Sequence, residues 1–225
     1  MDNSQVTFSI PSYNDAESLR TLLEEIQSFH SDSPVLVIDD GSTDDTVEVA
    51  REFAANNSNI QIVEHEKNQG FGFTFKEAFQ LPQTQWVFFL TGDNQFPAEN
   101  LFLMQKKMEE FDIIVGRRAT RMDNWKRRFN SMIYNRFTSI LAGRKITDTN
   151  SIMLFKRMVV SDLELNSESA FINAEFLLKA LKSGYSLIET DIIHKKRLHG
   201  EGSGGRIDVI TPVIKDAFRY IFGRL

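Results

Sequence analysis

Short runs of apolar residues recur along the first half of the chain, and each is followed by apolar residues at helical spacing. The runs are rich in branched and aromatic side chains and end at polar loops, which is typical of strands that are buried on both faces. They lie at residues 6–10, 35–38, 60–63, 86–90 and 113–115. Because strands and helices alternate, the pattern predicts an α/β fold, a mostly parallel sheet with helices on both faces.

The fourth run, Trp86 to Leu90, stops abruptly at the polar sequence TGDNQ, which spans residues 91–95. Open α/β sheets bind their ligands just beyond the carboxyl ends of strands. Asp93 and Gln95 place a carboxylate and an amide oxygen two positions apart, and oxygen ligands suit Mg²⁺ or Mn²⁺. The alternative is an ordinary turn with an Asp in it.

Four polar loops follow the first four predicted strands. Right-handed crossovers bring the carboxyl ends of parallel strands to one edge of the sheet. We therefore expect one site to form where these loops meet, at residues 11–15, 39–45, 67–72 and 91–97.

Two of these loops also contain patterns that are typical of helix starts. Asn14 is followed three residues later by Glu17, and Ser42 is followed by Asp45. Both pairs predict a side-chain cap at the first turn of a helix.

The pattern of the second half is less regular. We expect a strand at 152–155, a helix at 175–181, and a strand at 187–193 that runs antiparallel to its neighbour. An amphipathic helix is predicted at 211–225, with one apolar side formed by Ile214, Phe218, Ile221 and Leu225. Another helix should precede the strand at 152–155, with a buried face formed by Phe129, Met132, Ile133, Phe137 and Ile140.

Composition narrows the class of protein. A chain of 225 residues with 41% apolar residues is long enough for one large domain, and a net charge of −5 gives no general case for nucleic-acid binding. Without cysteine, disulfides and thiolate metal sites are excluded. The N-terminus does not have the pattern of a secretion signal, and no apolar run is long enough to span a bilayer. We expect a cytoplasmic protein.

The tail helix carries Lys215, Arg219 and Arg224 beside its apolar side. It could contribute to the core, form a homodimer interface, or lie on the cytoplasmic face of a membrane. We expect a single domain with a nucleotide-binding half at 1–116, an acceptor-side half at 117–205 and a C-terminal helix at 206–225.

With these loops placed, the chain resembles a family 2 glycosyltransferase of the GT-A fold. The resemblance covers nearly the whole chain and is closest to the dolichyl- and polyprenyl-phosphate sugar transferases. It rests on PSYND at 11–15, VIDDGSTDDT at 37–46, NQGFG at 68–72, GDNQFP at 92–97, DTNS at 148–151 and ETDIIHKKRLHGEGS at 189–203.

The resemblance implies a UDP- or GDP-linked sugar as donor, with Asp40 reading the base. Asp93 and Gln95 would hold Mg²⁺ or Mn²⁺, although Thr91 occupies the place of the motif's first acid. Donor and acceptor contacts would come from Pro11, Tyr13, Asp15, Asp39, Asp40, Thr91, Gly92, Arg118, Arg197 and Ser203.

The resemblance further implies inversion by direct displacement, with Asp93 and its cation neutralising the leaving diphosphate. A hydroxyl acceptor would need a carboxylate base, Asp148 or Glu175, whereas a polyprenyl phosphate is already ionised. Transfer to a growing glycan and a non-catalytic nucleotide-binding role are the alternatives. A phospho-receiver domain is disfavoured because it leaves the second half of the chain unexplained.

Overall fold

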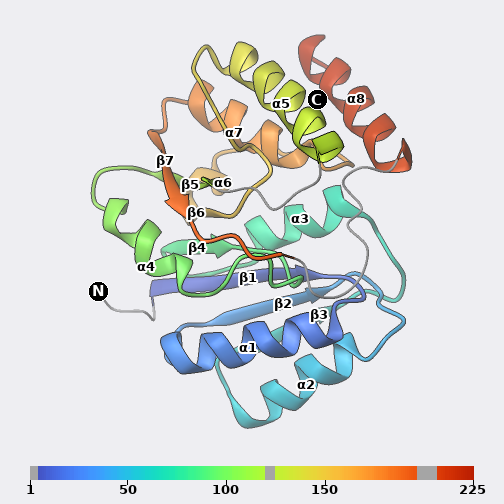
Figure 1. Cartoon of the computed structure of the whole chain (residues 1–225), viewed down its shortest axis with the longest axis vertical. Helices are drawn as coiled ribbons and strands as arrows, with labels where there is room; N and C mark the ends of the chain where they lie inside the picture. Colours follow the sequence, from blue (N-terminus) through green and yellow to red (C-terminus); the bar gives the residue numbers. More distant parts are fainter. Residues whose placement is uncertain (1–4, 120–124, 197–206) are drawn as a thin grey trace.

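The computed structural model describes residues 5–119, 125–196 and 207–225. Its centre is one seven-stranded sheet with the strand order β3-β2-β1-β4-β6-β5-β7 (Figure 1). The strands are β1 (Val6–Ser12), β2 (Val35–Asp39), β3 (Ile60–Glu64), β4 (Trp86–Phe89), β5 (Ile113–Arg118), β6 (Met153–Lys156) and β7 (Leu187–Ile192).

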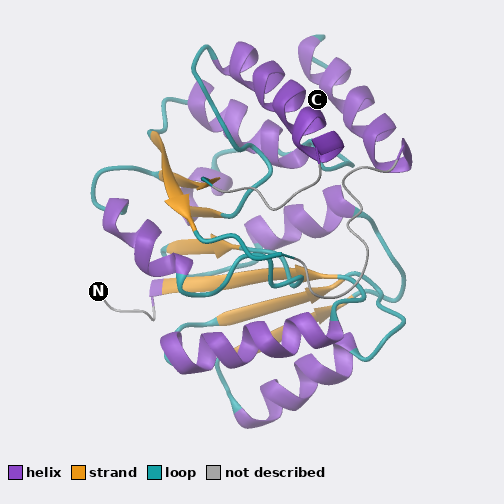
Figure 2. Ribbon diagram, in the orientation of Figure 1, coloured by secondary structure: helices purple, strands orange, loops and turns teal. Residues whose placement is uncertain are grey.

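Helices surround this sheet on both sides (Figure 2). The α-helices are α1 (Ala16–His30), α2 (Thr46–Asn56), α3 (Phe71–Gln80), α4 (Asn100–Met104), α5 (Trp125–Ala142), α6 (Arg157–Ser161), α7 (Ile172–Lys182) and α8 (Ile207–Ile221), and a short 3-10 helix, η2, spans Gln105–Lys107. Among the described residues, no helix combines the length and apolar character needed to cross a membrane. The mostly parallel α/β architecture expected from the alternating pattern is confirmed.

Strand β4 shows why the apolar runs do not alternate with polar residues. Trp86, Phe88 and Leu90 point into the core beneath α1, α2 and α4, whereas Val87 and Phe89 point into the core beneath α3, α6 and α7. Successive side chains of a strand face opposite sides of the sheet, so a run that is apolar throughout fills both cores.

The direction of β7 differs from the expectation. It pairs parallel to β5, from Ile113 opposite Leu187 to Arg118 opposite Ile192. The strand that runs against its neighbours is β6, which lies between β4 and β5 and is antiparallel to both. A strand from the second half of the chain therefore sits inside the sheet of the first half.

The expected buried face of α5 is wrong for four of its five residues. Phe129, Met132, Ile133 and Ile140 are exposed, and Phe137 is half-buried. The helix instead packs through a second apolar stripe that contacts α7 and α8 in a small core of its own. That core contains Tyr134, Phe137 and Leu141 from α5, Phe171, Ala174 and Leu178 from the α7 segment, and Val213, Ala217 and Tyr220 from α8.

Candidate functional site

The loops at the carboxyl ends of β1, β2 and β4 meet, as the crossover rule predicted. The backbone N–H of Asp40 donates to the carbonyl of Ser12 at 2.9 Å, and the N–H of Gly92 donates to the carbonyl of Pro11 at 3.1 Å. A Cβ atom on Gly92 would lie 2.1 Å from the Ser12 hydroxyl, so a side chain at this position would force the Ser12 side chain to move. The last residues of β1, which include the buried Pro11, therefore join the three loops at one edge of the sheet.

The predicted helix caps have a different role. Neither α1 nor α2 has a side-chain hydrogen bond from its N-cap residue. Instead, the N–H of Asn14 donates to the Ser42 hydroxyl at 2.9 Å, and the N–H of Thr43 donates to Oδ1 of Asn14 at 2.8 Å. Asn14 has a φ of 54°, a conformation that Asn tolerates better than most residues. These side chains join two loops rather than closing their own helices.

These contacts place Tyr13 and Asp15 beside the same edge. Tyr13 directly follows β1, and its ring is exposed. The N–H of Asp15 donates to the hydroxyl of Thr46 at 2.9 Å, at the start of α2. An exposed aromatic ring at this position can stack on a nucleotide base.

Asp40 is buried, and its carboxylate is bound by the protein itself. Oδ1 accepts from the N–H of Gln69 at 2.7 Å and lies 2.9 Å from Nδ1 of His65, and Oδ2 accepts from the N–H of Gly70 at 3.0 Å. Nε2 of His65 lies 2.7 Å from Glu77 on α3. Burial opposes a charge on the His65 ring, but the hydrogen bonds to the two carboxylates outweigh it and raise the pKa of His65. Asp40 thus holds the 65–70 loop, and both oxygens of its carboxylate already accept hydrogen bonds within the protein.

The neighbouring Asp39 differs from Asp40, because only one oxygen of its carboxylate has a hydrogen-bond partner among the described residues. Its Oδ2 accepts from the N–H of Ser42 at 2.9 Å, whereas its Oδ1 is buried without a hydrogen-bond partner among the described residues. The Ser12 hydroxyl and Oδ1 of Asn94 are in the same condition in the part of the chain that the structure describes. A buried polar oxygen without a partner is costly, so three at one sheet edge indicate a place where a ligand donates.

Asp93 and Gln95 lie on the β4 loop beside the end of β7. Oδ1 of Asp93 accepts from the hydroxyl of Thr91 at 2.8 Å and from the N–H of Gln95 at 3.3 Å. Gln95 is buried, and its side-chain amide nitrogen lies 3.4 Å from Nε2 of His194. Thr91, in the place of a second acid, therefore orients Asp93.

His194 reaches the site from a position that sequence reasoning did not connect with it. Asn100 fixes this segment, because its side chain donates to the carbonyl of Ile193 at 2.9 Å and accepts from the N–H of Ile193 at 2.8 Å. The N–H of Lys195 also donates to the carbonyl of Gln95 at 2.8 Å. The position of His194 follows from the parallel pairing of β7 with β5, which the sequence pattern did not predict.

These residues fit a hard divalent cation that takes part of its coordination from a ligand. No group of three or more His, Cys, Asp or Glu side chains among the described residues could hold a metal ion by itself. Asp93 and Gln95 supply oxygen atoms, and Mg²⁺ often completes its coordination with phosphate oxygens and water.

Arg118 and Asp148 form a buried ion pair. Nε of Arg118 donates to Oδ2 of Asp148 at 2.8 Å, Nη2 donates to Oδ1 at 2.6 Å, and the Arg118 N–H adds a third bond at 3.1 Å. The guanidinium also lies over the Phe96 ring, 5.8 Å from its centre. Glu189 holds the Asp148 loop, because its Oε1 accepts from the N–H and the hydroxyl of Thr147 and from the N–H of Asp148. Sequence reasoning named Arg118 as a substrate contact and Asp148 as a candidate base, but it predicted neither their pairing nor the role of Glu189.

Glu175 lies elsewhere, and the contacts of its carboxylate are those of a structural residue. The carboxylate is fully buried and accepts from the N–H groups of Asn166 and Ser167 and from the Lys179 ammonium. The structure therefore does not support Glu175 as a base. Arg197 and Ser203 lie outside the described residues.

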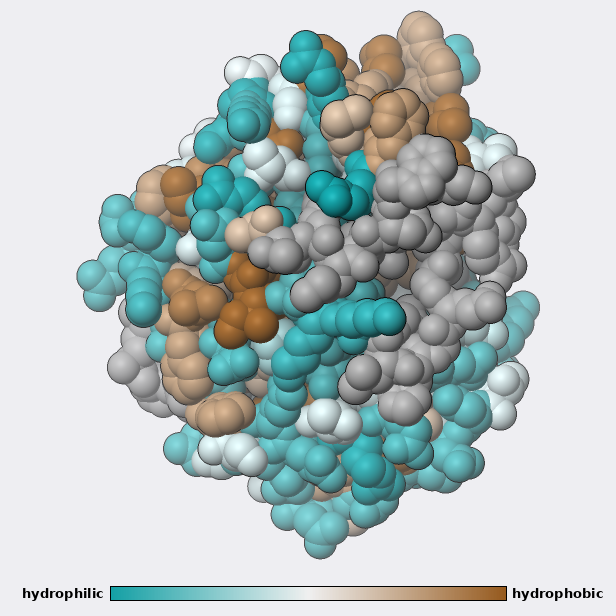
Figure 3. Space-filling model, viewed as in Figure 1, coloured by the Kyte–Doolittle hydropathy of each residue, from teal (hydrophilic) through white to brown (hydrophobic). Residues whose placement is uncertain are grey.

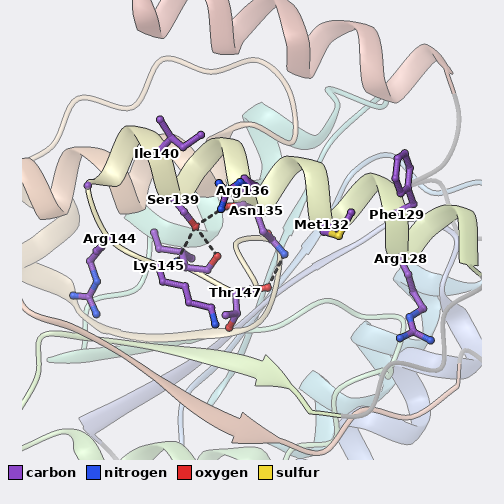
Figure 4. Close-up of a pocket in the computed structure, with 12 residues that line it drawn as sticks. Arg128, Phe129, Met132, Asn135, Arg136, Ser139, Ile140, Arg144, Lys145 and Thr147 are labelled. Atoms are coloured by element: carbon purple, nitrogen blue, oxygen red, sulfur yellow. Dashed lines mark hydrogen bonds between the residues drawn. The ribbon is translucent and has the colours of Figure 1, made fainter.

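A groove of about 880 Å³ runs along the exposed side of α5 (Figure 4). Its lining includes Thr147, the residue before Asp148. The described residues of its walls combine cationic and apolar side chains, and none of them is acidic. They are Arg128, Phe129, Met132, Asn135, Arg136, Ser139, Ile140, Gly143, Arg144, Lys145, Ile146 and Thr147.

Comparison with known proteins gives a consistent picture. Residues 7–164 match the family model described as glycosyl transferase family 2. An undecaprenyl-phosphate 4-deoxy-4-formamido-L-arabinose transferase of Aeromonas hydrophila is 28% identical over 218 residues, covering 93% of this chain and 66% of that protein. The chain thus spans just under two thirds of this relative. A dolichyl-phosphate hexose transferase of Haloferax volcanii is 27% identical over 190 residues, covering 82% of this chain and 80% of that protein.

Solved structures share the fold. Glucosyl-3-phosphoglycerate synthase of Mycobacterium tuberculosis, in complex with Mn²⁺, UDP and glucosyl-3-phosphoglycerate, matches with a TM-score of 0.75 at 13% identity, covering 98% of this chain and 79% of that one. A mannosyltransferase of Pyrobaculum calidifontis, in complex with GDP-Man and Mn²⁺, matches with a TM-score of 0.68 at 18% identity, covering 96% of this chain and 64% of that one.

Proposed function

Because this chain belongs to glycosyl transferase family 2, we propose that it transfers a sugar from a UDP- or GDP-linked donor to a polyprenyl phosphate. The observation that supports a nucleotide-sugar donor is the set of buried oxygens without partners among the described residues at one sheet edge, on Ser12, Asp39 and Asn94. Base and ribose N–H and O–H groups are the donors that such oxygens accept from. The relatives from Aeromonas and Haloferax are named for polyprenyl-type phosphate acceptors, which supports the acceptor half.

The division of labour between the two neighbouring aspartates follows from their contacts. Asp39 accepts a hydrogen bond from the base at Oδ1, the oxygen that has no partner among the described residues, and Tyr13 stacks on the ring of the base. Asp40 holds the 65–70 loop against the site through Gln69 and Gly70. This assignment moves base reading by one residue from the position that the resemblance implied.

Asp93 and Gln95 would hold Mg²⁺ or Mn²⁺ against the donor diphosphate. The bound cation would act as a Lewis acid that stabilises charge on the departing diphosphate. Thr91 keeps the Asp93 carboxylate oriented with its 2.8 Å hydrogen bond. We expect the donor's phosphate oxygens to take the place of the absent second carboxylate.

The proposal that the acceptor is a polyprenyl phosphate rests on the groove beside α5. A polyprenyl phosphate has an apolar chain and an anionic head, and the groove lining offers Phe129, Met132 and Ile140 together with four cationic side chains. A glycan would gain little from the apolar wall. Because the groove is lined by Thr147, the residue before Asp148, we expect a phosphate bound at this part of the groove to lie near the Arg118–Asp148 pair.

In the proposed reaction an acceptor phosphate oxygen forms a bond to the anomeric carbon as the bond from that carbon to the diphosphate breaks. The nucleoside diphosphate leaves with the bonding electrons, and the anomeric centre inverts. A phosphate nucleophile is already ionised near neutral pH and needs no base. We therefore assign Asp148 the task of positioning Arg118, since its carboxylate already accepts three hydrogen bonds from that residue.

A thermal-shift screen with UDP, GDP, CDP and dTDP, each with and without Mn²⁺ and Mg²⁺, tests the donor half. We expect stabilisation that needs both a cation and one nucleotide, and radiolabelled transfer from the matching donor to polyprenyl phosphate. Asp93→Ala should abolish both. Asp45→Ala is the matched control, because Asp45 is exposed and makes no side-chain cap. If a nucleotide raises the melting temperature equally with and without the cation, and does so also in Asp93→Ala, the protein is a non-catalytic nucleotide-binding member.

A further inference from the structure

Helix α8 has an exposed side and a buried side. The exposed side carries large apolar residues, which include Ile214 and Phe218, and Figure 3 shows apolar residues gathered over this helix. The buried side packs Ala217 against the core that α5 and α7 form. The same side carries Asp216, whose side chain is only 3% exposed. A buried carboxylate is costly unless it makes strong contacts, so its partners show which part of the protein α8 holds.

Asp216 binds the segment that precedes α7. Oδ2 of Asp216 accepts from the N–H of Glu168 at 3.0 Å, from the N–H of Ser169 at 3.1 Å and from the Ser169 hydroxyl at 2.7 Å. Oδ1 accepts from Nη1 of Arg219 at 3.2 Å. Hydrogen bonds to a carboxylate are roughly twice as strong as those between neutral groups, and a displaced helix would leave this charge buried without partners. Asp216 therefore fixes α8 relative to this segment.

Helix α7 holds the same segment from another side. The carboxylate of Glu175 is fully buried and accepts from the N–H groups of Asn166 and Ser167. Two buried carboxylates, one from α7 and one from α8, thus fix four consecutive residues, 166–169. We call these residues the 166–169 segment.

The 166–169 segment lies directly against the start of α3. A Cβ atom added to Gly72 would lie 2.2 Å from the carbonyl carbon of Glu168 and 2.6 Å from the carbonyl oxygen of Ser167. The two backbones therefore touch with no side chain between them. Gly72 is in the first turn of α3, two residues after Gly70. A shift of the segment would be passed on to the loop before α3.

The loop before α3 is in turn bound to the end of β2. Gln69 and Gly70 donate their N–H groups to the carboxylate of Asp40 at 2.7 and 3.0 Å. The loop also contacts Gly41, where an added Cβ atom would lie 2.5 Å from the carbonyl carbon of Lys67. The loop is thus held between the segment before α7 and the end of β2, with backbone in contact on both sides.

We propose that Asp216 is a positioning residue for nucleotide binding, through which α8 holds the loop before α3 in place. Its effect is indirect and passes through the 166–169 segment and Gly72 to the N–H groups that bind Asp40. The link to nucleotide binding rests on the proposed function. The positioning of the loop by α8 does not, because it follows from the contacts alone.

Hydrogen exchange of the protein without ligand tests the positioning of the loop. We expect the N–H groups of Gln69 and Gly70 to exchange on the order of tenfold faster in Asp216→Ala than in the wild type, because the loop opens more readily. Asp112→Ala is the matched control and should leave this exchange unchanged. Asp112 also accepts from the N–H and the hydroxyl of one serine, Ser186, and pairs with a lysine, but it lies at the amino end of β5, on the opposite edge of the sheet.

Calorimetric titration with UDP and with GDP, each with Mn²⁺ and well below the unfolding midpoint, tests the effect on binding. We expect Asp216→Ala to weaken the binding of the nucleotide that the wild type binds, on the order of tenfold. Asp216→Asn keeps the shape of the side chain and one accepting oxygen, so it should weaken binding less. Asp112→Ala should lower the unfolding midpoint without changing the affinity. Asp216→Asn also carries both measurements if Asp216→Ala does not fold.

Unchanged exchange at Gln69 and Gly70 in the Asp216 variants would overturn the proposal. Equal losses of affinity in Asp216→Ala and Asp112→Ala would do the same, because the effect would then follow from stability alone. Faster exchange with unchanged affinity would overturn the role of Asp216 in binding. If neither nucleotide binds to the wild type, faster exchange in Asp216→Ala but not in Asp112→Ala would support the positioning of the loop and contradict the proposed function instead.

Discussion

Nδ1 of His65 lies 2.9 Å from Oδ1 of Asp40, and this contact joins the end of β2 to the loop that follows β3. The other ring nitrogen reaches Glu77 on α3 at 2.7 Å, so one imidazole spans two carboxylates. Gly41 is packed against the same loop, with a φ of 71° and no room for a Cβ beside Lys67. The edge of the sheet where we propose that the nucleotide sugar binds is therefore stabilised by a titratable group, the imidazole of His65.

The first prediction concerns the pH dependence of this link. The pKa of folded His65 is raised above its ordinary 6.5, so its contribution to stability is fully present below pH 6.5 and is lost as pH rises through the folded pKa. We expect the free energy of unfolding of the wild type to exceed that of His65→Gln by on the order of 1 kcal/mol just below neutrality. Urea unfolding at a series of pH values measures this difference. A difference that grows with rising pH would contradict it.

His30 should behave in the opposite way. It is fully buried against Phe8 and Phe102, and burial lowers its pKa below 6.5. The ring is therefore neutral in the folded protein, and the unfolded chain binds the extra proton as pH falls below 6.5. As pH falls below 6.5, this residue should lower the free energy of unfolding of the wild type by up to about 1.4 kcal/mol per pH unit. The variant His30→Leu should lack this part of the pH dependence. The same urea series, run on this variant, would show no change in slope if the prediction is wrong.

Substitutions of the two neighbouring aspartates should affect different properties, the stability of the protein for Asp40 and the binding of the nucleotide for Asp39. Asp40→Asn removes a charge that accepts from two backbone N–H groups, so we expect a loss of about 2 kcal/mol in the free energy of unfolding. Asp39→Asn should leave stability nearly unchanged and weaken the binding of the nucleotide roughly tenfold to a hundredfold. Calorimetric titration with the nucleotide chosen by the thermal screen gives the affinity. Weak binding by Asp40→Asn with an unchanged unfolding midpoint would return the base-reading role to Asp40.

The Arg118–Asp148 pair is suited to a double-mutant cycle. Both side chains are nearly inaccessible, at 6% and 2% exposed, so removing one partner leaves a buried charge. Arg118→Met or Asp148→Leu alone should cost about 3–5 kcal/mol, and the double variant should cost less than the sum. Denaturant unfolding of the four proteins provides the coupling energy. Additive losses would mean that the two residues act independently and would reopen the assignment of Asp148 as a base.

The sequence was most informative where burial dictates the residue type. Trp86 to Leu90 covers β4 and the buried residue after it. Both faces of this strand are covered, so any polar residue there would enter a core. The handedness of crossovers then predicted that the loops after β1, β2 and β4 would meet. These inferences depend on local patterns and a general rule, so they needed no knowledge of distant contacts.

Other features depend on contacts that a local pattern does not contain. Asp39 and Asp40 are adjacent and identical in chemistry. Their roles differ because the imidazole of His65, 25 positions beyond Asp40, contacts the carboxylate of Asp40, whereas the backbone N–H of His65 donates to the main-chain carbonyl of Asp39. Helix α5 has two apolar stripes, and its sequence does not say which one meets α7. The direction of β7 is set by its pairing with β5, a strand from the first half of the chain.

The position of β6 has a consequence for synthesis of the protein on the ribosome. When residues 1–118 have emerged, β4 has β1 on one side, but its other edge and both edges of β5 wait for segments that are translated later. Exposed strand edges invite pairing with other chains, and contacts distant in sequence form slowly. A nascent chain that pauses before residue 153 should therefore be the species most in need of a chaperone, since four residues, Met153–Lys156, close the centre of the sheet.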